Sequence, residues 1–120
     1  MNTFKVGPLH EIDLDRAITH YLDVVLTKES IAFHITNEEN IELKQRYELT
    51  GIPDRCILWN GTANFLKYKN GLLSNKQEET ITRIVNAGFN VEVVRSIDDV
   101  EKALLKWGIP HTTSSVYTNE

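Results

Sequence analysis

The sequence predicts an α/β domain in which a mixed β-sheet is flanked by helices, in the order α-β-(α)-β-β-α-β-α. Three observations support this class. Apolar residues recur at helical spacing in three separate segments. An Asn-Gly pair at positions 60 and 61 separates two strand-like runs, which is typical of a β-hairpin. A strand, a helix and another strand then follow one another, as in a crossover that returns to the same sheet.

The composition is that of one soluble globular domain. Hydrophobic residues make up 41% and charged residues 25% of a chain of 120 residues, which is long enough for one core but not for two. We expect a single domain over residues 1–110 and a polar tail over residues 111–120. The single cysteine excludes an internal disulfide, and no apolar stretch could span a membrane, so a cytoplasmic location is expected. The net charge of −4 argues against a general nucleic-acid coat protein, but not against an enzyme that holds a cation through carboxylates.

The N-terminal half is expected to hold one long helix and one strand. A helix is predicted from about His10 to Leu26. Ser30–Thr36 is predicted to be a strand, because β-branched and aromatic residues lie between polar ends. Asn37–Asn40 is expected to be a loop, and Ile41–Leu49 is compatible with a short helix. The apolar stripe of the first helix consists of Leu14, Ile18, Tyr21, Leu22 and Val25.

A hairpin is predicted between Arg55–Trp59 and Ala63–Lys69, with Asn60-Gly61 as its turn. In a two-residue turn Trp59 pairs with Thr62, and Cys56 then pairs with Phe65.

The same register brings three polar residues together. It places Asp54 opposite Lys67, with Cβ atoms roughly 5 Å apart. Lys69, two residues further along the strand, points to the same face as Lys67. Cys56 and Leu58 are expected on the inner face of the sheet.

The C-terminal half predicts a helix, a strand and a last helix. Ser74 and Gln77 have the spacing of a capping box, and the helix that they begin is expected to end at Gly88. Asn90–Arg95 is predicted to be a strand, after which Ser96 caps the last helix, which ends at Gly108 and Pro110. The inward-facing residues are expected to be Ile81, Ile84 and Val85 in one helix, and Val100, Leu104 and Trp107 in the other.

Asp54, Lys67 and Lys69 fall at the spacing of a metal-dependent nuclease motif, in which Pro-Asp is followed by a carboxylate, any residue and lysine. Hydrolysis of a phosphodiester needs a cation that neutralises the phosphate and a deprotonated water. Magnesium is usually held by one or two carboxylates, and a neighbouring lysine can stabilise developing charge. Glu11 leads the apolar stripe of the first helix, and a carboxylate on that face needs a partner such as a cation. Lys67, however, stands where the second motif carboxylate belongs.

In these motifs the chain resembles a stand-alone VRR-NUC domain, a branch of the PD-(D/E)xK nuclease superfamily that is found alone in phages and fused to DNA-repair nucleases. The resemblance runs from about Glu11 to Ile109 and implies a restriction-endonuclease-like fold. The matching parts are Glu11, His34…Asn37-Glu38, Gly51-Ile52-Pro53-Asp54, Phe65-x-x-x-Lys69, Ser74-x-x-Gln77 and Val93-Val94-Arg95-Ser96.

The resemblance implies a role for each residue of a metal site. Asp54 would be the main ligand of Mg²⁺ or Mn²⁺, Glu11 a further carboxylate of the metal site, and the Tyr68 carbonyl another ligand. Lys69 would act on the nucleophilic water, and Gln77 would support the site.

The resemblance also implies a substrate. Small members look like homodimeric resolvases of four-way DNA junctions, which implies branched double-stranded DNA as the partner and a bacterial host cell as the location. We expect His34, Asn37 and Lys76 to contact this DNA.

Lys67 predicts a disabled site. A lysine in place of glutamate changes the local charge by two units, and one pair of unit charges at ~4 Å is worth about 4 kcal/mol at an effective dielectric near 20. We therefore expect weak metal binding and little cleavage, caused by an introduced or selected inactivating change or by natural loss. A carboxylate that has migrated from Glu38, Glu78 or Glu79 is a third explanation.

Structural interpretations remain beside the catalytic ones. Asp54 and Lys67 also fit a simple cross-strand ion pair. Ser74 and Gln77 fit a capping box without a catalytic role, and Glu11 would be exposed if Asp13 capped the first helix. The alternative function is a non-catalytic DNA-binding or protein-interaction module that retains the nuclease fold.

Overall fold

The computed structural model describes residues 11–35 and 51–112, and the elements named below lie within these ranges. The predicted loop Asn37–Asn40 and the tentative helix Ile41–Leu49 lie outside them, as do residues 113–120. The elements in chain order are α1 (Glu11–Val25), β1 (Ile31–His34), β2 (Arg55–Trp59), β3 (Thr62–Tyr68), α3 (Asn75–Asn86), β4 (Asn90–Val94) and α4 (Ile97–Trp107).

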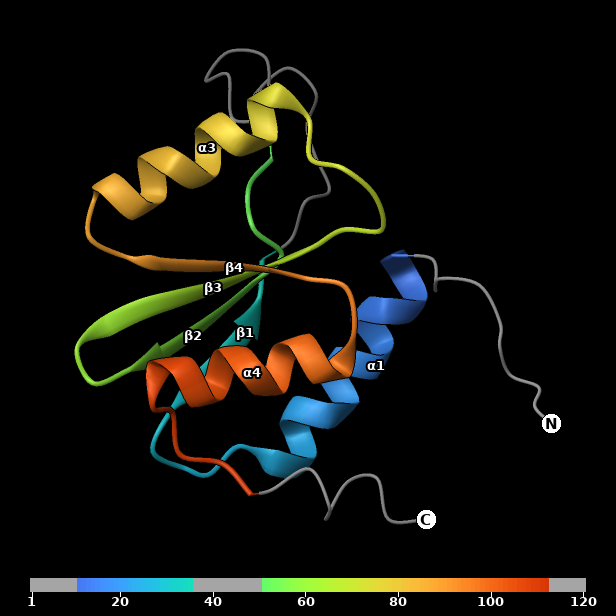
Figure 1. The fold of residues 1–120 in the computed structure, drawn as a ribbon. Helices are drawn as coiled ribbons and strands as arrows, with labels where there is room; N and C mark the ends of the chain where they lie inside the picture. Colours follow the sequence, from blue (N-terminus) through green and yellow to red (C-terminus); the bar gives the residue numbers. More distant parts are fainter. Residues whose placement is uncertain (1–10, 36–50, 113–120) are drawn as a thin grey trace, which may run out of the picture.

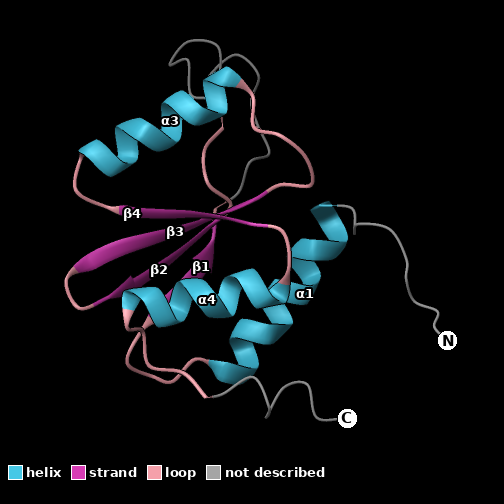
Figure 2. Cartoon of the chain, viewed as in Figure 1, coloured by secondary structure: helices cyan, strands magenta, loops and turns pink. Residues whose placement is uncertain are grey.

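The strands form one four-stranded mixed sheet in the order β1-β2-β3-β4. The first three strands are antiparallel, and β4 is parallel to β3. Parallel neighbours need a crossover connection, which α3 supplies between β3 and β4 (Figure 2). The α/β class and the mixed sheet predicted from the sequence are therefore confirmed.

The β2–β3 hairpin turns at Asn60 and Gly61, with φ angles of +56° and +76°. Two successive positive φ angles match the twist of the flanking strands, and Asn-Gly supplies them at low cost. Trp59 pairs with Thr62 and Cys56 with Phe65, so the register predicted by counting from this turn is confirmed.

Helices α1 and α4 cover one face of the sheet, and α3 lies over the other face (Figure 1). The hydrophobic core fills the space beneath α1 and α4, whereas no residue of α3 is buried. The predicted stripe of α1 is buried throughout, as are Val100 and Leu104 of α4. This core is completed by Ile57, Leu66, Tyr68, Val94, Ala103 and Ile109.

Alternation along the strands corrects one expectation about the sheet. Ile57 belongs to the core beneath α1 and α4, so its neighbours Cys56 and Leu58 point to the opposite face. Cys56 is buried there as predicted, but Leu58 is exposed. The inner face expected for Leu58 was therefore wrong.

Helix α3 also departs from its predicted orientation. Ile81 and Ile84 are half-buried, whereas Val85, predicted to point inward, is exposed. The residues that α3 turns towards the sheet side are Thr80, Arg83, Ile84 and Ala87, which line one pocket. Helical geometry places Val85 away from that face.

The chain beyond α4 stays attached to the end of α1. His111 forms an isolated bridge with Leu26, and the amide of Thr112 donates a hydrogen bond of 2.8 Å to the Val25 carbonyl. Among the described residues, no helix is both long enough and apolar enough to cross a membrane.

Candidate functional site

Asp54 lies immediately before β2. It continues the pairing of β2 with the strand segments on either side of it, β1 and β3. Its amide donates to the Leu66 carbonyl over 2.9 Å, and its carbonyl accepts from the Ile35 amide over 2.8 Å. This continued register places Lys67 opposite Asp54, as counting from the hairpin turn predicts. The Lys67 Nζ atom lies 3.7 Å from Asp54 Oδ2.

The pair is nearly enclosed. The side chain of Lys67 is 10% exposed and that of Asp54 is 18% exposed. Lys67 Nζ also donates to the Ile52 carbonyl over 3.4 Å, and the Tyr68 amide donates to Asp54 Oδ2 over 2.7 Å. The lysine is therefore held by the segment that leads into β2, and Oδ2 of Asp54 both accepts the amide hydrogen bond and forms the ion pair with Lys67.

These residues do not fit a divalent cation as they stand. In residues 11–35 and 51–112, no group of three or more His, Cys, Asp or Glu side chains could hold a metal ion. A cation needs oxygen ligands, and the group facing Asp54 is an ammonium that supplies none. At ~4 Å, each unit of like charge opposes binding by about 4 kcal/mol at an effective dielectric near 20.

Lys69 and Gln77 both follow this pair in the chain. The Lys69 amide donates to the Val94 carbonyl over 3.2 Å, so the strand pairing of β3 with β4 continues to this residue. Alternation then directs its half-buried side chain to the face of Lys67. Lys76 lies exposed in the first turn of α3.

Gln77 forms the capping box predicted with Ser74. Gln77 Oε1 accepts from the Ser74 amide over 2.8 Å, and the Gln77 amide donates to Ser74 Oγ over 3.1 Å. The side-chain oxygen of Gln77 is thus used in starting the helix. Its backbone has a second role, because it packs against Gly51.

Gly51 fixes the distance between α3 and the segment that carries Asp54. Its φ angle is +78°, and a Cβ atom added there would lie 2.7 Å from Gln77 Cα. Only glycine accommodates both the positive φ and this close approach. The first turn of α3 is therefore positioned directly against the residues before Asp54.

One predicted site residue, His34, is not brought to this pair, and the positions of two others relative to it lie outside the described part of the structure. His34 is in register with Arg55 and therefore lies on the opposite face of the sheet from Lys67. There its Nε2 atom lies 3.6 Å from Asp15 Oδ1. Glu11 is the first residue of α1 and its side chain lies outside the described part of the structure, as does Asn37 altogether.

A buried polar network beneath α1 was not predicted. Arg55 donates from Nε to the Tyr68 hydroxyl over 2.9 Å and from Nη2 to Thr19 Oγ1, and Nη2 lies 3.7 Å from Asp15 Oδ1. Burial raises the pKa of Tyr68 above its ordinary value, and the Arg55 hydrogen bond opposes that shift. The available signal was an arginine at a core-facing strand position, where a charge requires partners.

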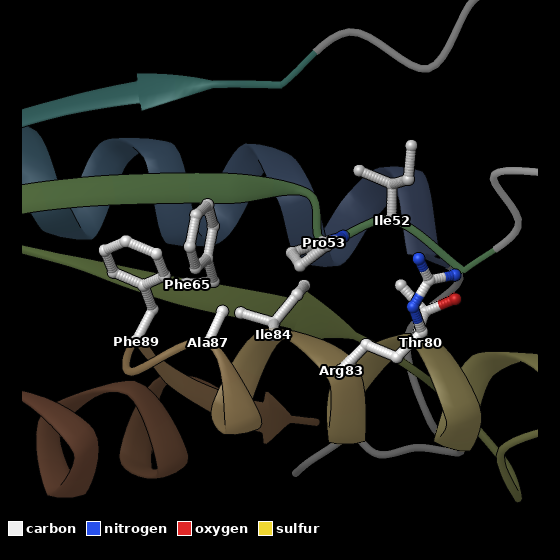
Figure 3. A pocket seen from close by; sticks show the side chains of 8 residues that line it. All are labelled: Ile52, Pro53, Phe65, Thr80, Arg83, Ile84, Ala87 and Phe89. Carbon is white, nitrogen blue, oxygen red and sulfur yellow. The ribbon is translucent and has the colours of Figure 1, made fainter. Parts of the chain in front are cut away.

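A pocket of about 370 Å³ lies between α3 and the sheet. Figure 3 shows Phe65 and Phe89 at one end and Thr80 and Arg83 at the other. We call this cavity the α3 pocket; its lining residues are Ile52, Pro53, Phe65, Thr80, Arg83, Ile84, Ala87 and Phe89.

The architecture defines an α/β protein with the restriction-endonuclease-like fold. Among solved structures, the chain is similar to a VRR_NUC domain protein, with a TM-score of 0.66 and 16% sequence identity over 84% of this chain and 89% of that chain. At this identity the likeness establishes the fold alone, and on that level the predicted resemblance is confirmed. No protein-family model matches the sequence. No curated protein matches it either.

Proposed function

We propose that this chain is a VRR-NUC-type endonuclease for branched DNA, such as four-way junctions, and that Lys67 disables its hydrolytic step. The observation that supports the proposal is the placement of Asp54 and Lys67 on facing backbone positions, 3.7 Å apart between Oδ2 and Nζ, in a fold similar to that of a VRR_NUC domain protein. A carboxylate at position 67 would give two acidic groups at this point. Magnesium and manganese favour such oxygen ligands.

The residues present can still bind a phosphodiester. Lys67 and Lys69 lie on one face of β3, and cations beside a phosphate stabilise its charge. What they lack is the second carboxylate that would hold a divalent cation and so activate a water. We therefore propose retained DNA binding with lost cleavage.

The test is the substitution Lys67→Glu, assayed on a four-way junction with Mg²⁺ or Mn²⁺. We expect cleavage that is absent from the unaltered chain and that needs the metal. Lys67→Gln is the matched control, because it removes the ammonium without adding a carboxylate, and it should stay inactive. Equal cleavage by the unaltered chain and by Lys67→Glu would contradict the role given to Lys67.

Binding of Mn²⁺ gives an independent readout by titration calorimetry. Lys67→Glu should bind Mn²⁺ more tightly than the unaltered chain, and the double substitution Lys67→Glu with Asp54→Asn should lose that gain. If Lys67→Glu binds no better than Lys67→Gln, the residue pair is not a metal site.

A second candidate is a non-catalytic module that binds DNA or protein. It is favoured by Ile31, Phe33 and Leu58, whose exposed fractions are 64%, 43% and 41% on adjacent strands. An apolar surface of this kind commonly marks an interface. Undetectable cleavage by both the unaltered chain and Lys67→Glu, together with tight partner binding, would favour this candidate.

The proposed assembly is a homodimer, which would present two sites to the paired strands of a junction. Light scattering should give twice the mass of one chain, and Phe33→Ser should reduce that mass if the apolar residues of β1 and β2 form the interface. A monomer at all concentrations would contradict the dimer without affecting the catalytic proposal.

A further inference from the structure

The α3 pocket shares a wall with the Asp54–Lys67 pair. Ile52 lines the pocket through its side chain, and its carbonyl oxygen accepts the hydrogen bond from Lys67 Nζ. Pro53, the next residue, also lines the pocket and directly precedes Asp54. The pair and the pocket are therefore neighbours that share the segment Ile52–Pro53.

Cations surround this pocket although the chain carries a net charge of −4. Lys67 and Lys69 lie on the same face of the sheet as the lining residue Phe65. Arg83 lines it, and Lys76 lies one turn before Thr80, whose hydroxyl donates to the Lys76 carbonyl. Of the carboxylates on this side, Asp54 is already paired with Lys67, Glu78 lies in the first turn of α3, and Glu79 precedes Arg83 by one turn. This side of the molecule therefore favours an anionic ligand.

The lining itself favours a flat apolar group. The rings of Phe65 and Phe89 meet edge to face, with centroids 6.5 Å apart (Figure 3). Phe89 is 42% exposed, so part of its ring is open to a ligand. The volume of about 370 Å³ falls within the ~300–1,000 Å³ range of small-molecule pockets.

We propose that the α3 pocket takes one unpaired nucleobase from DNA whose backbone lies along Lys67 and Lys69. A nucleotide combines a flat heterocycle with a phosphodiester, and this site combines an aromatic apolar cavity with adjacent cations. Every base has a π-face, so stacking on phenylalanine would select unpaired over paired DNA with little preference for sequence. The inference rests on the proposed function and says how the protein distinguishes branched DNA from a continuous duplex.

The experiment uses a forked DNA with 2-aminopurine at the first unpaired position and fluorescein at the far end of the duplex. Anisotropy of fluorescein measures DNA binding, and 2-aminopurine fluorescence reports whether that base changes its environment. Without added metal, we expect the unaltered chain to bind the fork more tightly than a continuous duplex and to change the 2-aminopurine signal.

Phe89→Leu keeps an apolar side chain but removes the ring. It should weaken fork binding about tenfold and leave duplex binding unchanged. Leu105→Ala is the control, because Leu105 is 65% exposed on α4 and does not line the pocket. Arg83→Gln should weaken binding to both DNAs, whereas Lys102→Gln, on α4 across the sheet, should not.

Ala87→Phe provides a second route that does not depend on removing Phe89. Ala87 is exposed at the end of α3, so a larger side chain would narrow the pocket without entering the core. It should reduce fork binding and the 2-aminopurine response together.

The outcomes separate the two proposals. If DNA binds but the 2-aminopurine signal and the fork preference survive both Phe89→Leu and Ala87→Phe, the nucleobase site is overturned and the proposed function stands. If no DNA binds, both are overturned. If Phe89→Leu instead lowers the mass measured by light scattering, a second copy of the chain occupies the pocket and the nucleobase site is again overturned.

Discussion

Oδ2 of Asp54 accepts a hydrogen bond of 2.7 Å from the Tyr68 amide and forms an ion pair with Lys67 Nζ, 3.7 Å away. The amide is a backbone donor at the end of β3, and the ammonium is almost buried. Loss of the carboxylate would leave the amide without its acceptor and the ammonium without its counter-charge, which is costly for groups removed from water. The pair therefore contributes to the folded state as well as to the chemistry of the site.

Asp54→Ala should lower the free energy of unfolding by about 2–4 kcal/mol, because a nearly buried ammonium loses its counter-charge and an amide loses its acceptor. Asp54→Asn should cost less, since its carboxamide oxygen can still accept from the Tyr68 amide. Urea unfolding of each variant, alone and combined with Lys67→Met, gives the coupling free energy between the side chains of Asp54 and Lys67. Additive effects in this cycle would show that the two side chains do not interact.

Gly51→Ala should be more destabilising than Gly61→Ala, although the φ angles of the two glycines are +78° and +76°. An added Cβ at Gly51 meets Gln77, whereas one at Gly61 meets no atom within 4 Å. At Gly61 the substitution should lower the free energy of unfolding by about 1 kcal/mol, because only the left-handed backbone conformation is strained. Steric overlap should add about 1–3 kcal/mol at Gly51. Equal thermal unfolding midpoints would contradict this close packing of α3.

Arg55→Met should lower the free energy of unfolding by about 2–4 kcal/mol, because it strips Thr19, Asp15 and Tyr68 of a buried partner. Arg16→Met is the matched control. The Arg16 side chain is 75% exposed and lies 3.9 Å from Asp13, and such surface pairs contribute about 0–1 kcal/mol. Similar unfolding free energies for the two variants would mean that the network beneath α1 is not stabilising.

Stability should fall as the pH rises above about 8.5, where a free thiol ordinarily begins to ionise. Burial raises the pKa of the Cys56 thiol, against a smaller opposing effect of the Asn64 backbone hydrogen bond. The folded state then holds a proton that the unfolded chain has lost, so the free energy of unfolding decreases with pH in this window. Cys56→Ala should flatten this decrease in urea titrations between pH 8 and about 9.5. Tyr68, whose pKa is also raised, should make the free energy of unfolding decrease further above about pH 10, and this decrease should remain in Cys56→Ala.

The hairpin and the Asp54–Lys67 contact could be predicted because one local signal determines both. Asn60 and Gly61 fix the turn, and every cross-strand pair then follows by counting. The helix starts at Ser74 and Ser96 were equally local, since each side chain accepts from an amide three residues ahead.

The second layer of the fold could not be predicted in the same way. The apolar stripe of α3 indicates a helix, but it does not reveal how closely that helix approaches the sheet, so Val85 was assigned inward. The Arg55 network joins residues 13 and 36 positions apart, and no spacing rule connects them. The separation of His34 from Lys67 depends on which strand residue it pairs with, which a single sequence does not state.

The apolar core lies almost entirely beneath α1 and α4, whereas α3 buries no residue. The large apolar core therefore lies on one side of the sheet, and the Asp54–Lys67 pair and the α3 pocket lie on the other. Side chains on the α3 side can be exchanged over evolutionary time without dismantling the core. Such a division lets residues around the α3 pocket change their chemistry while the core beneath α1 and α4 stays the same.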